Sequence, residues 1–217
     1  MRYQAVLFDF DGTLVDSEAL HYQSWMTVLT QDNIHYTELE FCDEFSGVPT
    51  LKAAQTLKLR HQLQPSPQAL CDHKNRIFVA RAATVFPKLM PYAKQILELT
   101  AKRVPIALVT GSSKAEALPV LDHYQLLGLF SVIICKDDVT QPKPHPEPYN
   151  KALSALNIAP HQAVAIEDTY TGLTSAKEAG VTAVVVPNVH SSKQDFIHAD
   201  HLFTDLEAVF KWLSASE

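Results

Sequence analysis

Short apolar runs alternate with amphipathic stretches along most of the chain, and this alternation predicts how the chain folds. The run at 5–8 (Ala-Val-Leu-Phe) contains no polar residue, as is typical of a strand buried on both faces of a parallel sheet. Similar strands are expected at 106–109, 132–135, 163–166, 181–186 and 201–203, with helices between them, including 91–101 and 206–213. Repeated strand–helix–strand units predict a mostly parallel sheet with helices on both faces.

The stretch after the first strand departs from this alternation. Between 17 and 84 no run resembles a buried strand, and candidate helices lie at 19–30, 38–45, 49–59 and 67–83. A purely helical insert at this point indicates a separate module. The predicted fold class is therefore α/β: a Rossmann-like, mostly parallel core formed by 1–16 and 85–217, with an inserted all-helical cap domain at 17–84.

Composition limits the classes of protein to consider. With 217 residues, 47% of them hydrophobic, the chain can bury a large core. A net charge of −6 argues against a nucleic-acid partner, and no apolar run approaches the ~20 residues that span a bilayer. We expect no signal peptide before the first strand, and a monomer is the default. Cys42, Cys71 and Cys135 form no CxxC pair, which favours reduced thiols in a cytoplasmic protein.

Two carboxylates stand where the first strand ends, in the sequence FDFDGT at 8–13. In extended backbone, Asp9 and Asp11 point to the same side. Paired carboxylates repel each other unless a cation or a shared proton intervenes, so the pair suggests a functional site. Taken alone, the pair is equally compatible with ordinary turn chemistry.

Other strand ends bring further polar residues to the same expected edge of the sheet, where ligands bind in open α/β folds. Thr110-Gly111-Ser112-Ser113 follows one strand, Lys143 lies in the loop after the next, and Glu167-Asp168 ends another. Four acids with one lysine favour Mg²⁺, and free N–H groups at a helix start suit a phosphate. Taken singly, each piece has another explanation: a helix cap, a solvated lysine, or capping carboxylates. Their joint position favours a site.

These motifs resemble those of the haloacid dehalogenase superfamily of phosphotransferases, in their order along the chain. FDFDGT at 8–13, LVTGSS at 108–113, the lysine of QPKPHPEPY, and AIEDTYTG at 165–172 carry the resemblance, which covers essentially the whole chain. The pattern is closest to the branch of β-phosphoglucomutase-like proteins and sugar phosphatases, whose helical cap follows the first strand.

The resemblance implies a Mg²⁺-dependent phosphatase. Asp9 would attack phosphorus and form an aspartyl-phosphate, and Asp11 would act as general acid and then as general base. We expect Asp9 to stay ionised beside the metal and Asp11 to take up a proton near neutral pH.

The resemblance also assigns the remaining groups around the reacting phosphate. Thr110 and Lys143 would hold the phosphoryl oxygens, with Gly111 and Ser112 in the same phosphate-binding turn. The metal would be bound by Asp9, by the backbone carbonyl of Asp11 and by Asp168, with Glu167 as a ligand or as its support.

The cap is expected to select the substrate, a small phosphorylated metabolite of the sugar-phosphate class. Gly47-Val48-Pro49-Thr50 matches the substrate-specificity loop, and His21 matches a position near the hinge. In β-phosphoglucomutases, an arginine three places after the glycine binds the distal phosphate; here Thr50 stands there, which favours hydrolysis. Lys52 is a candidate substitute and keeps a phosphosugar mutase open. A phospho-accepting regulatory domain and a retired enzyme that serves as a binding module are more distant alternatives.

Overall fold

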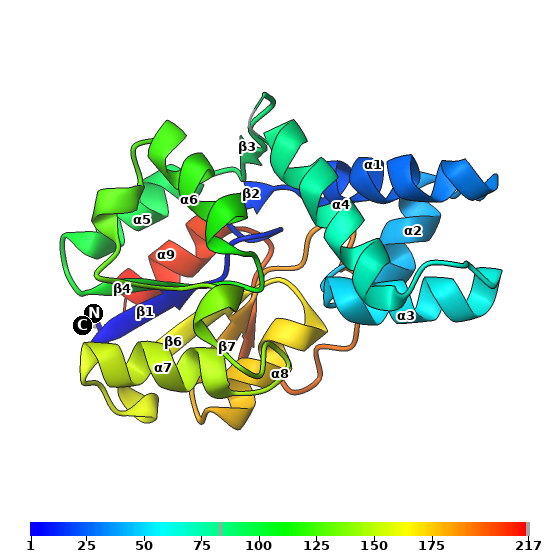
Figure 1. Cartoon of the computed structure of the whole chain (residues 1–217). Helices are drawn as coiled ribbons and strands as arrows, with labels where there is room; N and C mark the ends of the chain where they lie inside the picture. Colours follow the sequence, from blue (N-terminus) through cyan, green and yellow to red (C-terminus); the bar gives the residue numbers. More distant parts are fainter. Residues whose placement is uncertain (83, 216–217) are drawn as a thin grey trace.

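The computed structural model describes residues 1–82 and 84–215. Its main sheet has six strands, all parallel, in the order β5-β4-β1-β6-β7-β8 (Figure 1). The strands are β1 (Ala5–Phe8), β4 (Ile106–Val109), β5 (Val132–Ile134), β6 (Ala163–Glu167), β7 (Thr182–Val185) and β8 (His201–Leu202). The predicted α/β fold with a Rossmann-like core is confirmed, and each strand ends within one residue of its expected end.

Helices cover both faces of this sheet (Figure 1). One face packs against α5 (Ala93–Ala101), α6 (Lys114–His123) and α9 (Leu206–Ser214), and the other against α7 (Glu147–Leu156) and α8 (Tyr170–Glu178). Successive strand residues alternate between the two, so Phe8 joins the first core cluster and Leu7 the second. Four short 3-10 helices complete the connections: η1 (Thr30–Asp32), η2 (Leu127–Leu129), η3 (Lys136–Asp138) and η4 (Pro160–Gln162).

The insert after β1 consists of four helices, which lie together at one end of the sheet (Figure 1). They are α1 (Glu18–Leu29), α2 (Glu38–Phe45), α3 (Thr50–His61) and α4 (Pro67–Ala82). The insert has an apolar core of its own, which includes Trp25, Leu29, Phe41 and Leu57. This separate apolar core explains why the sequence pattern of the insert differs from that of the sheet-containing core. Ala83, the last residue of the expected helix 67–83, lies outside the described residues.

A second, antiparallel pair of strands joins the two parts and was not expected. β2 (Val15–Asp16) pairs with β3 (Lys88–Leu89), where the chain leaves the core and where it returns. Strands of two residues are too short to produce a periodic pattern. Nearby, α5 begins at Ala93 and not at Pro91, because Tyr92 adopts a left-handed backbone with φ 66°. Among the described residues, no helix is both long and apolar enough to cross a membrane.

The face covered by α7 and α8 is lined by small residues, which sets a packing test. Ala165 is fully buried in it, so Ala165→Leu should overpack the interface and lower the free energy of unfolding by about 1–3 kcal/mol. Urea denaturation measures the change. Ala115→Leu adds the same bulk at an exposed position of α6 and should change it little. Equal stability of the two variants would contradict this packing.

Candidate active site

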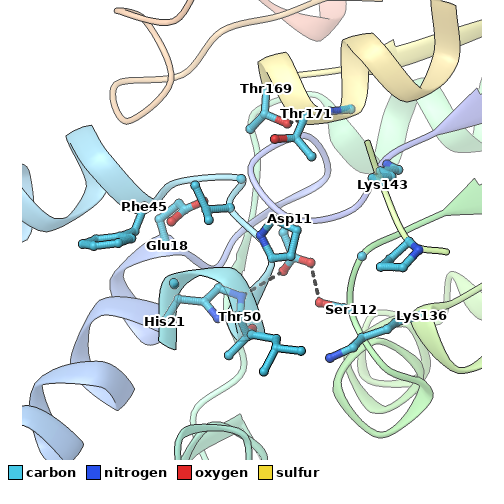
Figure 2. A pocket seen from close by; sticks show the side chains of 18 of the residues that line it. Asp11, Glu18, His21, Phe45, Thr50, Ser112, Lys136, Lys143, Thr169 and Thr171 are labelled. Atoms are coloured by element: carbon cyan, nitrogen blue, oxygen red, sulfur yellow. Dashed lines mark hydrogen bonds and ion pairs between the residues drawn. The ribbon is translucent and has the colours of Figure 1, made fainter. Parts of the chain in front are cut away.

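Most of the expected site residues line a cavity of about 330 Å³ between the core and the helical insert, whereas Thr110 and Glu167 are not among its lining residues. Its floor is formed at the carboxyl ends of β1, β4 and β6. β1 lies between β4 and β6. The chain runs outward from β1 through β4 to β5 on one side and from β6 through β7 to β8 on the other, so the cavity lies at the topological switch point. The insert contributes the opposite wall through residues such as His21, Val48 and Thr50 (Figure 2).

Lys143 connects two of the carboxylates. Its ammonium donates to Asp9 Oδ1 at 2.7 Å, to Glu167 Oε1 at 2.6 Å and to the carbonyl oxygen of Val109 at 2.7 Å. All three ionic side chains are buried. The alternative of a solvated loop lysine is therefore wrong, although Lys143 lies in a proline-rich loop.

The buried acids have the composition of a divalent cation site. One carboxylate oxygen from each of Asp9, Glu167 and Asp168 lies within 4.8 Å of the others. Glu167 Oε2 is buried and has no hydrogen-bond partner among the described residues. Three buried carboxylates face a single buried lysine, so a cation bound only by oxygen ligands, such as Mg²⁺, fits the charge and the donor set.

The pKa values of Asp9 and Asp168 are raised by the same physical cause. Burial, and then the charge of Glu167, raise the pKa of Asp9 to about 7, against the lowering effect of Lys143. Burial, and then Asp9, raise the pKa of Asp168 well above its usual value. A bound divalent cation would favour the ionised form of both groups.

Asp11 has different surroundings from Asp9. Figure 2 shows it between His21 of the insert and Ser112 of the core. It accepts hydrogen bonds from Ser17 Oγ at 2.6 Å and Ser112 Oγ at 2.5 Å, and His21 Nε2 lies 3.6 Å from Oδ1. Its side chain is not part of the acidic cluster.

These contacts overturn one expectation. Burial favours a high pKa for Asp11, but the neighbouring His21, followed by the hydroxyls of Ser112 and Ser17, lowers it to about 2. The prediction that Asp11 carries a proton near neutral pH is therefore wrong for this arrangement. The sequence showed the two acids but not the donors that stabilise the second one as a carboxylate.

Lys74 of α4 is a site residue that sequence reasoning missed. Its fully buried ammonium lies 2.7 Å from His21 Nδ1 and 4.6 Å from the ring centre of Phe78, on which His21 stacks. Lys74, His21 and Asp11 thus form a chain of contacts from the insert to the core. Lys74 falls on the apolar stripe of α4 with Leu70, Cys71 and Phe78, and a lysine in such a stripe was the available signal.

The turn after β4 is both a helix cap and an open wall of the cavity. Ser113 and Glu116 form a capping box at the start of α6, as the alternative explanation held. Thr110 Oγ1 accepts from the backbone N–H of Ser112 at 2.9 Å and lies 3.5 Å from Asp11 Oδ2. A Cβ added to Gly111 would meet nothing within 4 Å, so this turn is open for a ligand.

The loop before α3 rests on the core. Gly47 has a left-handed backbone (φ 72°), and a Cβ there would lie 2.6 Å from Cγ2 of Thr169. Ser46 donates through Oγ to Glu18 at 2.9 Å and accepts at its carbonyl oxygen from Gln194 at 3.2 Å. This loop therefore brings Val48 and Thr50 to the cavity wall.

Two further positions complete the comparison with the sequence expectations. Asn188 was missed; its side-chain amide donates to Asp168 Oδ2 at 2.8 Å and to the carbonyl oxygen of Gly12 at 3.2 Å. No sequence motif marks it, because its role depends on the loop after β7. Lys52 is exposed on α3 and is not among the residues that line the cavity.

The hydrogen bonds to Asp11 yield a measurable prediction. Ser17→Ala removes a donor to the carboxylate, so the pKa of Asp11 should rise; the Ser17 hydroxyl does not cap α1, and the helix start should be preserved. Carbon-13 NMR titration of the Asp11 carboxyl measures the change. Ser24→Ala is the control, because Ser24 lies on the same helix and donates only to Leu20. The same Asp11 pKa in both variants would contradict the geometry.

Comparison with known proteins agrees with the geometry. The family model for haloacid dehalogenase-like hydrolases matches residues 6–186. Validoxylamine A 7'-phosphate phosphatase of Streptomyces hygroscopicus subsp. limoneus is 32% identical over 213 residues, covering 97% of each chain. The phosphorylated carbohydrates phosphatase of Thermotoga maritima is 31% identical over 198 residues, covering 88% of each.

A solved structure extends the similarity to three dimensions. The crystal structure of CbbY from Rhodobacter sphaeroides in complex with phosphate superposes with a TM-score of 0.81, at 28% identity and 94% coverage of each chain. The resemblance indicated by the sequence motifs is confirmed: the chain belongs to the haloacid dehalogenase-like hydrolase family.

Proposed function

We propose that the protein is a Mg²⁺-dependent phosphomonoester hydrolase that acts on a small phosphorylated metabolite of the sugar-phosphate class through an aspartyl-phosphate on Asp9. The observation that carries the proposal is the different environment of two carboxylates in one cavity. Asp9 contacts the buried lysine and the acidic cluster, whereas Asp11 contacts hydroxyls and His21. A nucleophile and an acid/base need this difference.

The first half of the reaction transfers the phosphoryl group to Asp9. A carboxylate oxygen of Asp9 attacks phosphorus, the P–O bond to the alcohol breaks, and Asp11 gives its proton to the departing oxygen. Lys143 and Thr110 hold the phosphoryl oxygens, and Gly111 and Ser112 line the same cavity. Asp11 is ionised beforehand, so the bound phosphate, as a neighbouring negative charge, must raise its pKa enough for it to take up a proton.

The second half restores the enzyme. Asp11, now a carboxylate, takes a proton from water, the water oxygen attacks phosphorus, and the bond from phosphorus to Asp9 breaks. Inorganic phosphate leaves. Mg²⁺, held by Asp9, Asp168 and Glu167 with the backbone carbonyl of Asp11, would balance the negative charge that collects here.

The helical insert has the role of a lid in this proposal. The loop at Gly47 rests on Thr169, and His21 reaches Asp11, so the described arrangement closes the insert over the reacting groups. Closure excludes water and brings the specificity loop to the substrate. The proposal includes a monomer in the cytoplasm, where a reducing environment fits the three free, buried cysteines.

Hydrolysis is favoured over phosphosugar mutase activity by the composition of the cavity wall. Thr50 holds the place of the arginine that grips the distal phosphate in mutases, and none of the described residues along the cavity is an arginine. Lys52, the candidate substitute, is exposed and outside the lining. Without a bidentate partner, a bisphosphate intermediate loses the group that would retain it while it reorients.

The nucleophile can be tested directly. Asp9→Asn should lower Mg²⁺-dependent phosphate release from an aryl phosphate at least about a thousandfold, because the attacking carboxylate is lost. EDTA should abolish release by the parent protein. Asp122→Asn, an exposed position on α6, serves as the control with full activity. Stoichiometric phosphorylation without turnover would instead support a phospho-accepting regulatory domain.

The lid has a separate test. In Gly47→Ala the new Cβ would clash with Thr169, and the backbone would be strained at positive φ. The loop should therefore no longer pack against Thr169. We expect kcat/KM for sugar phosphates to fall by about tenfold to a hundredfold, since misplaced groups are costly. Gly128→Ala is the matched control, because a Cβ there meets nothing within 4 Å. If both variants had equal kinetics, packing of this loop against Thr169 would not be required for catalysis.

A further inference from the structure

One cation of the cavity has no role in the chemistry described so far. Of the three lysines in the lining, Lys143 is bound to Asp9 and Glu167, and Lys74 contacts His21. Lys136, the first residue of η3, is half-buried, and its ammonium makes no hydrogen bond or ion pair with any residue that the structure describes. A charge that lines a cavity without a partner is available to a ligand.

The backbone holds Lys136 firmly in the cavity wall. Its N–H donates to the carbonyl oxygen of Ser112 at 2.9 Å, which ties η3 to the phosphate-binding turn. The side chain extends from the core toward the insert (Figure 2). Its charge reaches α4. Burial raises the pKa of Cys71, and Lys136 opposes that rise; burial lowers the pKa of Lys74, and Lys136 makes a smaller contribution in the same direction.

The sheet sets the distance between Lys136 and the reacting phosphate. Lys136 follows β5, Asp9 follows β1, and β4 lies between them. Neighbouring strands are about 4.8 Å apart, so these two backbone positions are separated by roughly 10 Å across the sheet. That distance is comparable to the length of a small sugar phosphate. A ligand with its phosphoryl group at Asp9 can therefore present its other end to Lys136.

We propose that Lys136 binds a second anionic group of the substrate, a phosphate or a carboxylate at the end remote from the scissile ester. The inference rests on the proposed phosphatase function and narrows its substrate class to phosphomonoesters that carry a further negative charge. Glu18, the acid of the insert in the cavity wall, already accepts from Ser46, whereas the ammonium of Lys136 is unpaired among the described residues. The second anion supplies the missing partner.

This subsite does not restore a mutase. A lysine is a single point charge and cannot grip a phosphate with two parallel hydrogen bonds as arginine does. Lys136 also belongs to the core and not to the insert, so it stays beside the catalytic groups when the lid opens. It selects one orientation of the substrate.

Two matched pairs of substrates test the inference. 6-Phosphogluconate carries a carboxylate at C1, where glucose 6-phosphate carries a carbon at the aldehyde level, and glucose 1,6-bisphosphate carries a second phosphate on that carbon. The readout is the ratio of kcat/KM for the member with the second anion to kcat/KM for glucose 6-phosphate. We expect the parent protein to favour the doubly anionic member in at least one pair by about tenfold or more, and the preferred pair identifies the anion.

Three variants assign that preference to Lys136. Lys136→Met should lower the ratio about tenfold or more, mainly through KM, whereas Lys136→Arg should keep most of it. Lys52→Met removes an equal charge from the exposed surface of the insert and should leave the ratio unchanged. Dissociation constants measured by calorimetry in the Asp9→Asn background should follow the same order, independently of turnover.

The outcomes separate this inference from the proposed function. An unchanged ratio in Lys136→Met, or preference of the parent protein for glucose 6-phosphate in both pairs, overturns the role of Lys136. If aryl phosphate is hydrolysed in that case, the phosphatase stands. If the parent protein releases no phosphate from any of these compounds with Mg²⁺, the proposed function fails, and the substrate class falls with it.

Discussion

The constraint on which the site depends is the burial of three carboxylates around one ammonium. Asp9, Glu167 and Asp168 lie at the ends of two adjacent central strands, and Lys143 reaches two of them. Buried like charges are unfavourable, and one lysine offsets only part of the excess. The remaining negative charge makes the site receptive to a divalent cation and, through it, to a phosphate. The parallel sheet is the means by which residues far apart in sequence are held in this unfavourable proximity.

Asp11 shows how the same edge of the sheet can hold a second acid with a different role. It is only two residues from Asp9, but it contacts Ser17, Ser112 and His21 and not the acidic cluster. His21 in turn contacts Lys74, so the state of Asp11 depends on where the helical insert lies. In the proposed mechanism, proton transfer and closure of the insert are coupled through these contacts, because opening the insert would remove His21 from the carboxylate.

The sequence predicted the parts that follow from local pattern. The buried strands were predicted from their apolar runs. The rule that ligands bind beyond the carboxyl ends of parallel strands then placed Asp9, Thr110, Lys143 and Asp168 in one expected site. It missed β2 and β3, whose two residues each carry no periodicity. It also missed Asn188, because a contact made by a loop after β7 depends on tertiary structure. The prediction that Asp11 is protonated was wrong for a related reason: its hydrogen-bond donors are Ser17, just before α1, and Ser112, in the turn after β4.

In the proposed mechanism, selection of the substrate is divided between the insert and the core. The insert supplies Val48, Thr50 and His21 to the cavity wall, and its loop at Gly47 rests on Thr169. The core supplies Lys136, which keeps its place beside Ser112 whether the insert is open or closed. A substrate can therefore be oriented by its remote charge on the core before the insert closes on its middle. In a mutase, the bisphosphate intermediate must reorient so that its second phosphate reaches the nucleophile. The group that binds the remote phosphate must therefore release it when the insert opens. Lys136 belongs to the core, so a remote anion bound to it would not be released when the insert opens. This opposes reorientation of the intermediate and favours transfer of the phosphoryl group from Asp9 to water.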